Sequence, residues 1–472
     1  FSLQPDTSDS FVYLDEYVNF LVDRFGMANT SNGIKGYSLD NEPGLWISTH
    51  PRIHPLQARC VEMVQKAIGV STAVKNVDPY LEIFGPVLYG FNAYYDFQSA
   101  ADWDSVKAGT NYQWFIDYYL DQMRLAEISS GKRLLDVLDI HWYPEARGDN
   151  RITETNANTT ADKLARVQAP RTLWDNNYTE NSWIGQWFGA YLPLIPRLKE
   201  SIDEYYPGTK LAFTEFSYGG ENDITGAIAM ADVLGIFGKY DVYLGTYWQL
   251  DSPSNYISAA YKIYRNYDGN NSTFGDNSVP SVTSDSVSTS VYSSLNETGN
   301  EIHLVVINKK LNESVNSNFT ILSQHNIQSG SVWKLDGNSF EIAEINPVIN
   351  ITNNSFSYTL PAGSVCHFVL ETDAVNVEEE NQFPENYFLT AYPNPFNPGT
   401  TISWHSPVGS WQTIKIFNSL GQEVDTIVNE YLEAGNHSKL YIANSTLTSG
   451  VYFAILNSNS GIISTQKLIL LK

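Results

Sequence analysis

The chain has 472 residues, more than one ordinary domain holds, so the sequence predicts two or three domains. It carries 52 acidic and 28 basic residues, a formal net charge of −24, which argues against nucleic acid or an anionic membrane surface as a partner. No apolar run reaches about 18 residues, so no membrane-spanning helix is expected. The two cysteines fall in what we expect to be different domains, and we interpret them as buried thiols.

Residues 1–268 alternate helical patterns with short apolar runs, which is typical of a parallel sheet with helical crossovers. Helical spacing predicts helices at 11–25, 56–77, 112–129, within 183–206, at 225–240 and at 258–267. Apolar runs predict strands at 34–39, 81–86, 134–142, 210–214 and 242–248. Residue 1 is Phe and no signal-peptide pattern follows, so we interpret the chain as a fragment that lacks its N-terminal part.

The second half of the chain predicts β structure. Residues 269–371 combine Ser, Thr and Asn with short apolar runs of period two, which indicates a β-sandwich. Residues 372–386, which include three consecutive glutamates, are interpreted as an acidic linker. Residues 387–472 predict a separate small β-sandwich.

Two carboxylates are expected at the ends of strands in the first domain. Pro43 prevents both continued pairing and a helix start at Glu42, which leaves Glu42 at the carboxyl end of a strand with Asn41 beside it. Another apolar run leads directly into Glu215. Catalytic groups of a parallel barrel come from the carboxyl ends of different strands, so we expect both carboxylates at one mouth. The alternative for each is a surface or salt-bridged carboxylate.

The segment Gly36–Pro55, GYSLDNEPGLWISTHPRIHP, resembles glycoside hydrolase family 44, endoglucanases and xyloglucanases that cut β-1,4-glucans. The resemblance implies a partial (β/α)8 TIM barrel made of about strands four to eight, with a sandwich packed on it. It also implies that Glu42 is the acid/base and Glu215 the nucleophile of a retaining reaction. A barrel without its first strands would have open edges, and we expect little activity from it in isolation.

Other side chains are candidates for substrate contacts at this mouth. Asn41 is predicted to bind the sugar 2-hydroxyl, with capping of its own loop as the alternative. His141 and Tyr143 end a predicted strand, and either could orient Glu215; a core histidine bonded to a backbone carbonyl is an alternative for His141. Indole rings stack on sugars, although packing explains the same pattern, and the candidates are Trp46, Trp183, Trp187 and Trp248.

The sequence does not assign a metal site. His50 and His54 stand four residues apart, but a proline follows each, so we predict the rim of a cleft rather than a ligand pair. Asp268 and Asp276 offer oxygen donors for a structural calcium ion, without the spacing of an EF-hand. The chemistry requires no cofactor.

The C-terminal unit contains the run Tyr392–Pro398, YPNPFNP, followed by Gly450-Val451-Tyr452 and a last strand ending at Lys472. These features resemble the C-terminal sorting domain of type IX secretion substrates. The resemblance implies recognition by that machinery and a secreted or surface-attached protein. The alternative is a carbohydrate-binding module, although no row of aromatic residues suggests a sugar platform.

These features predict a secreted, monomeric, retaining endo-β-1,4-glucanase whose partner is a cellulose-type β-glucan or xyloglucan. A xylanase or mannanase with the same mechanism is one alternative. A non-catalytic surface glycan-binding protein is another, although both glutamates are present.

Overall fold

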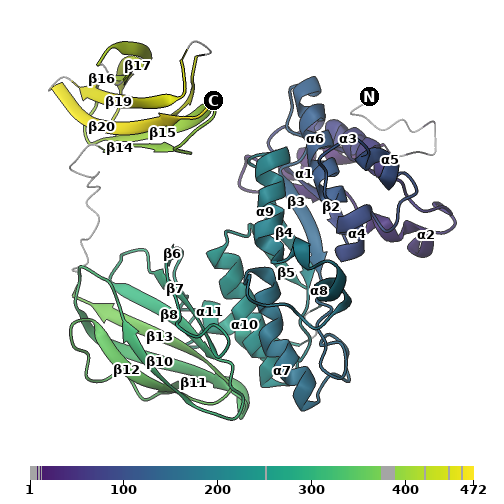
Figure 1. The fold of residues 1–472 in the computed structure, drawn as a ribbon, viewed down its shortest axis with the longest axis vertical. Coiled ribbons are helices and arrows are strands. Elements are labelled where there is room, and N and C mark those ends of the chain that lie inside the picture. Colours follow the sequence, from purple (N-terminus) through teal and green to yellow (C-terminus); the bar gives the residue numbers. More distant parts are fainter. Residues whose placement is uncertain are drawn as a thin grey trace. The chain divides into compact units, whose positions relative to one another are not determined.

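The computed structural model divides into two compact units, Phe1–Val375 and Asn376–Lys472 (Figure 1). Each unit is described by itself. Among the described helices, none combines the length and apolar character needed to cross a membrane. The residues that the structure describes are Ser8, Phe11, 13–249, 252–373, 388–418, 421–444, 447–458 and 461–472.

A five-stranded parallel sheet, in the order β1-β2-β3-β4-β5, forms the first part of unit one. All five predicted strands are present, with ends shifted by up to three residues. Because each strand pairs with the next in the chain, their carboxyl ends meet at one edge of the sheet. The strands are β1 (Gly36–Ser38), β2 (Glu82–Leu88), β3 (Val137–Trp142), β4 (Lys210–Phe216) and β5 (Leu244–Tyr247).

Helices connect and cover these strands. The α-helices are α1 (Leu14–Phe25), α2 (Trp46–Thr49), α3 (Cys60–Val77), α4 (Phe91–Asp96), α5 (Trp103–Lys107), α6 (Phe115–Ser130), α7 (Thr160–Gln168), α8 (Trp183–Trp187), α9 (Leu194–Tyr205), α10 (Ile224–Lys239) and α11 (Tyr256–Arg265). The 3-10 helices are η1 (Pro43–Leu45), η2 (Ala169–Leu173) and η3 (Gly189–Tyr191).

The helix predictions needed correction at three places. The helix predicted from residue 56 begins at Cys60, and the stretch 183–206 holds two helices separated by η3. Helices α4, α5 and α7 were not predicted. Helix α7 carried a readable signal, because Thr159 accepts from the Asp162 backbone N–H at 3.2 Å while the Asp162 carboxylate accepts from the Thr159 N–H in a capping box.

A β-sandwich follows the parallel sheet within unit one. Its larger sheet has the order β11-β10-β13-β8-β7-β6, and β12 pairs with β9. Strands β6 and β11 were not predicted, and the predicted linker residue Thr372 instead ends β13; residues 374–387 lie outside the described ones. The strands are β6 (Asn277–Val279), β7 (Thr289–Leu295), β8 (Glu301–Asn308), β9 (Val315–Thr320), β10 (Ile327–Asp336), β11 (Ser339–Ile345), β12 (Ser355–Leu360) and β13 (Ser364–Thr372).

Helices α10 and α11 lie between the parallel sheet and the sandwich (Figure 1). A buried ion pair crosses this contact: Lys309 Nζ of the sandwich lies 2.7 Å from Asp232 Oδ2 of α10. Tyr292 donates its hydroxyl to the other oxygen of Asp232 at 2.6 Å. A buried charge that loses its partner is strongly destabilising, so these bonds tie the two parts into one folded unit.

Two buried histidines lie at the same contact. His367 of β13 donates its Nδ1 hydrogen to the Ile263 carbonyl of α11 at 2.7 Å, and its Nε2 lies 3.0 Å from His303 Nδ1. Burial, and next the nearby His303, lower the pKa of His367 to about 3. His367 is therefore neutral in the folded protein over a pH range in which the unfolded chain binds a proton.

We predict that His367 makes unit one sensitive to acid. The stability that a neutral His367 contributes is present above pH 6.5, the unfolded value, and is lost as pH falls toward 3. Between pH 7.5 and 4.5, His367→Phe should lose about 2 kcal/mol less unfolding free energy than wild type, measured by urea titration. Val332→Ala, in the sandwich core, should lower stability equally at both pH values. Parallel pH curves for wild type and His367→Phe would contradict the assignment.

The second unit is all β, with a three-stranded sheet β14-β15-β18 and a four-stranded sheet β17-β16-β19-β20. In the proline-rich segment, the Phe396 backbone N–H bonds to the Ile469 carbonyl, and Asn394 bonds to the same final strand. The strands are β14 (Phe388–Tyr392), β15 (Gly399–Ser406), β16 (Ser410–Asn418), β17 (Glu423–Leu432), β18 (Gly435–Ile442), β19 (Gly450–Ser458) and β20 (Gly461–Leu470).

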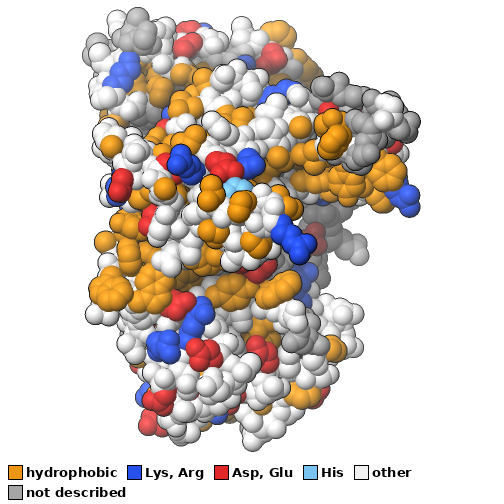
Figure 2. All heavy atoms as spheres, turned by 90° about the vertical axis from the view of Figure 1, so that its right-hand side faces the viewer, with side chains coloured by type: hydrophobic (Ala, Val, Ile, Leu, Met, Phe, Trp, Pro, Cys, Tyr) orange, Lys and Arg blue, Asp and Glu red, His pale blue; other side chains and the backbone are white. Residues whose placement is uncertain are grey.

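Charged side chains of both signs are interspersed on the face shown in Figure 2, with hydrophobic side chains among them. Some large hydrophobic residues are strongly exposed, such as Ile53 and Leu56 in the loop before α3, at 84% and 75%. The excess of acidic residues in the sequence is thus not gathered into one acidic zone on this face.

Candidate active site

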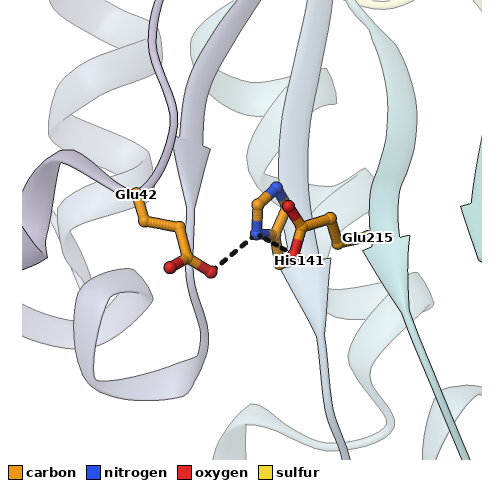
Figure 3. A group of neighbouring side chains, drawn as sticks. All are labelled: Glu42, His141 and Glu215. Carbon is orange, nitrogen blue, oxygen red and sulfur yellow. Dashed lines mark hydrogen bonds and ion pairs between the residues drawn. The ribbon is translucent and has the colours of Figure 1, made fainter. Parts of the chain in front are cut away.

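Three ionisable side chains converge near the carboxyl ends of the parallel strands (Figure 3). His141 Nδ1 on β3 lies 2.9 Å from Glu42 Oε1 and 3.4 Å from Glu215 Oε2. One ligand atom from each of the three residues lies within 4.8 Å of the other two. The carboxylates that the sequence predicted at one mouth are therefore brought together across 173 residues of chain.

Glu42 lies in the connection between β1 and η1. Its backbone is left-handed, with φ 51° and ψ 54°, and Pro43 begins the 3-10 helix directly after it. The Glu42 N–H donates to the carbonyl of Val87 at 3.0 Å. Val87 also has positive φ and is the extra residue where the β2–β3 register shifts. Non-glycine residues with such backbone angles cluster at functional sites, and here they point the Glu42 side chain toward β3.

Glu215 lies within β4 rather than after it. The sequence predicted a strand that ends at Thr214, but β4 continues to Phe216. Its register with β3 pairs Ile140 with Phe213 and His141 with Glu215, so Thr214 is an additional residue, as in a β-bulge. Because a one-residue shift exchanges the two faces of a strand, this irregularity decides which way Glu215 points.

His141 and Tyr143 hold Glu215 from β3 and the loop that follows it. The His141 side chain is 1% exposed, and its Nδ1 faces two carboxylates, not the backbone carbonyl considered as an alternative. Tyr143 donates its hydroxyl to Glu215 Oε2 at 2.7 Å. Burial, and next the bond to Glu215, raise the pKa of Tyr143 well above its usual value, so the phenol remains a donor.

A cavity of about 340 Å³ opens beside Glu42. Trp183, at the start of α8, lines it and packs edge-to-face on Phe91 at 5.9 Å. Arg151 forms an ion pair with Glu145 at 2.8 Å in the same wall. The remaining lining residues are Tyr89, Gly90, Asn92, Trp142, Tyr143 and Ile184. Aromatic faces combined with hydrogen-bonding groups suit a neutral, polyhydroxylated ligand.

The same three residues are the only group of at least three His, Cys, Asp or Glu with clustered ligand atoms in the described part of the chain. A nitrogen and two carboxylate oxygens fit the donor preferences of zinc. Asp268 instead accepts hydrogen bonds from its own loop, from the Asn270 N–H and the Ser272 hydroxyl, and Asp276 lies 3.8 Å from Arg265. A structural calcium ion stays a prediction.

Residues 1–146 match the model of glycoside hydrolase family 44. A solved xyloglucanase of this family from Paenibacillus polymyxa has 56% sequence identity and a TM-score of 0.76, covering 79% of this chain and 73% of that chain. The chain belongs to glycoside hydrolase family 44. Endoglucanase A from Paenibacillus lautus is 54% identical over 407 residues. A bifunctional glucanase-xylanase protein from a metagenome library is 33% identical, with a TM-score of 0.66, covering 76% of this chain and 68% of that chain.

The family 44 chain spans only part of its curated relative. The match to the Paenibacillus lautus protein covers 85% of this chain and 58% of that protein. Residues 390–471 match a secretion system C-terminal sorting domain, as the sequence predicted. Unit two therefore carries a sorting domain.

The other predicted contacts of this family 44 chain are dispersed. Asn41, beside Glu42, is exposed, and Trp46 lines a separate cavity of about 370 Å³ with His50 and His54. Trp187 and Trp248 are 70% and 56% exposed and do not line the cavity beside Glu42. Their roles as stacking platforms stay predictions.

The two loop histidines do not form a ligand pair. His54 Nε2 lies 2.9 Å from Glu62, and the hydrogen bond to Glu62 raises the pKa of His54. Sequence reasoning missed Tyr89, Glu145 and Arg151 as cavity residues. They follow predicted strands, which was the one available signal, but polar loop residues without a motif do not reveal which cavity they line.

Proposed function

We propose that this protein is a retaining endo-β-1,4-glucanase in which Glu42 and Glu215 are the catalytic pair. The observation that carries the proposal is that an oxygen of each carboxylate lies within 4.8 Å of the other. Retaining glycosidases hold their carboxyl groups about 5–5.5 Å apart, whereas inverting enzymes leave about 6.5–9.5 Å for a water molecule. The spacing therefore favours a covalent intermediate over direct attack by water.

In the first step, Glu215 attacks the anomeric carbon and forms a glycosyl ester. The bond to the leaving sugar breaks, and its oxygen takes the proton of Glu42. In the second step, Glu42 accepts a proton from water, whose oxygen attacks the anomeric carbon and releases Glu215. His141 and Tyr143 hold Glu215 in place by the contacts described above, so that the nucleophile remains an aimed carboxylate.

Substrate contacts follow from the cavity beside Glu42. Trp183 is proposed to stack on a sugar ring next to the cleaved bond, and Asn41 to bind the 2-hydroxyl at that bond. Trp46, Trp187 and Trp248 are proposed as platforms farther along the glucan, for which exposed indole faces are suited. The enzyme is proposed to act as a monomer.

The printed names of the relatives support a β-1,4-glucan as substrate, with xyloglucan as one form. The relative described as a glucanase-xylanase keeps xylan open as a second substrate. Comparison of initial rates on xyloglucan, carboxymethylcellulose, xylan and mannan distinguishes these possibilities. Binding to any of them without hydrolysis would instead indicate a non-catalytic glycan-binding protein.

We also infer that the five parallel strands are part of a (β/α)8 barrel, at about strands four to eight. The sequential strand order supports this inference, as does the position of the paired glutamates at the carboxyl ends of the strands.

The catalytic pair predicts opposite responses to substitution in the full-length protein. Glu215→Ala should lower turnover of a glucan by at least about 10³-fold, and azide should restore cleavage of an activated aryl glycoside to give a glycosyl azide of inverted configuration. Glu42→Ala should retain cleavage of substrates with good leaving groups, since these need no proton donor. Glu204→Ala, on the exposed surface of α9, is the matched control and should match wild type. Near wild-type glucan hydrolysis by either active-site variant would refute the pair.

Metal removal separates this mechanism from metal-assisted hydrolysis. If Glu42, His141 and Glu215 act as acid, positioning residue and nucleophile, EDTA should leave initial rates unchanged, and added Zn²⁺ should inhibit by occupying the three donors. Activity that EDTA abolishes and Zn²⁺ restores would contradict the proposal. A fall in melting temperature with EDTA that Ca²⁺ reverses would reveal the predicted structural calcium ion.

We further propose that the sorting domain directs type IX secretion to the cell surface or medium. Deletion of residues 387–472 should leave specific activity unchanged, since unit one contains the whole candidate site, and should retain the protein in the periplasm of a host with this pathway. In a matched host without the pathway, both proteins should remain periplasmic. Loss of hydrolysis with intact export would make unit two part of the glucan-binding machinery.

A further inference from the structure

Strand β4 places one more residue than its neighbours in front of the catalytic pair. On the β3 side, Phe213 pairs with Ile140 and Glu215 with His141. On the β5 side, Phe213 pairs with Gly245 and Phe216 with Tyr247, so two residues of β4 stand opposite a single one. The irregularity is therefore a bulge in β4 itself.

The bulge changes the face on which Glu215 lies. Strict alternation would place Thr214 and Phe216 on one face and Phe213 and Glu215 on the other. Instead, Phe213 and Phe216 both pack on Phe237 of α10, at ring-centroid distances of 4.9 and 5.1 Å. Thr214 and Glu215 are thus both left for the opposite, concave face, where Glu215 reaches His141.

Hydrogen bonds from two adjacent strands hold the extra residue. Thr214 donates its hydroxyl to Asp139 Oδ1 on β3 at 2.5 Å. From the other side, the hydroxyl of Thr246 on β5 donates to the Thr214 carbonyl. Asp139 stands two residues before His141 and therefore on the same face of β3. The anchor of the bulge and the partner of the carboxylates are carried by one strand.

Asp139 is costly as a purely structural residue. It is completely buried, and its Oδ2 has no hydrogen-bond partner among the described residues. Burial raises the pKa of Asp139 to about 6, against the opposing effect of the bond from Thr214. An apolar side chain at this position would avoid the desolvation of a carboxyl group. The bond to Thr214 is the interaction that such a side chain could not replace.

We propose that Asp139 is a positioning residue that holds the β4 bulge through the Thr214 hydroxyl and thereby aims Glu215 at the anomeric carbon. The inference rests on the proposed role of Glu215 as nucleophile. Displacement of a reacting group by about 1 Å costs on the order of 10²-fold in rate, so loss of one anchoring bond is measurable without loss of the fold.

The test compares isosteric and conservative variants of the full-length protein. Thr214→Val, which lacks the hydroxyl, and Asp139→Ala should each lower kcat about 10- to 100-fold with little change in KM. Thr214→Ser and Asp139→Asn, which retain a donor and an acceptor, should recover most of that loss. The loss in Thr214→Val should persist on an aryl glycoside with a good leaving group, because the defect lies in the nucleophile and not in proton donation by Glu42.

Stability is controlled by Val332→Ala in the sandwich, which should lower the melting temperature without changing kcat. Wild-type kcat in Thr214→Val, or failure of Thr214→Ser to recover activity, would overturn the inference. So would a loss that disappears with the good leaving group. The outcome is separable from the proposed function: an active Glu215→Ala refutes the nucleophile itself, whereas inactive Glu215→Ala beside fully active Thr214→Val refutes only the anchor.

Discussion

The buried imidazole of His141 between two carboxylates is the interaction around which the candidate site is arranged. Two carboxylates this close repel each other, and a donor between them lowers the cost of holding them together. Since the His141 side chain is 1% exposed, its position is set by the sheet and not by solvent. Tyr94 adds to this from α4, donating its hydroxyl to the His141 carbonyl. Glu42 and Glu215 must then reach a fixed point from either side.

They reach it by departures from regular structure. Glu42 adopts a left-handed conformation, and its N–H bonds to Val87, the extra residue where the β2–β3 register shifts. Glu215 is turned by the bulge at Thr214. Regular strands would present alternate side chains to one face, and neither carboxylate would meet the histidine. Bulges are frequent beside active sites because they redirect a side chain without changing the strand that carries it.

The parallel sheet is supported by the sandwich on the far side of α10 and α11. Their contact combines apolar packing with buried polar bonds, including the pair Lys309–Asp232 and the bond from His367 to Ile263. Buried polar groups demand specific partners, so this contact specifies one arrangement of the two layers. The sorting domain has its own hydrophobic core, around Trp404 and Ile416, and is a separate compact unit. Catalysis and export are thus assigned to parts that fold around different cores.

The sequence by itself determined the five parallel strands, most of the long helices, the two glutamates and the sorting domain. These features are written in local patterns: apolar periodicity, a proline after Glu42, and contiguous motifs. Only the tertiary structure decided that Thr214 is a bulged residue, that Tyr89 and Arg151 line the cavity, and that Trp187 does not. Register, bulges and the convergence of loops depend on pairing between segments far apart in the chain. No window of local sequence contains that information, because the free energy that selects it comes from the packed sheet.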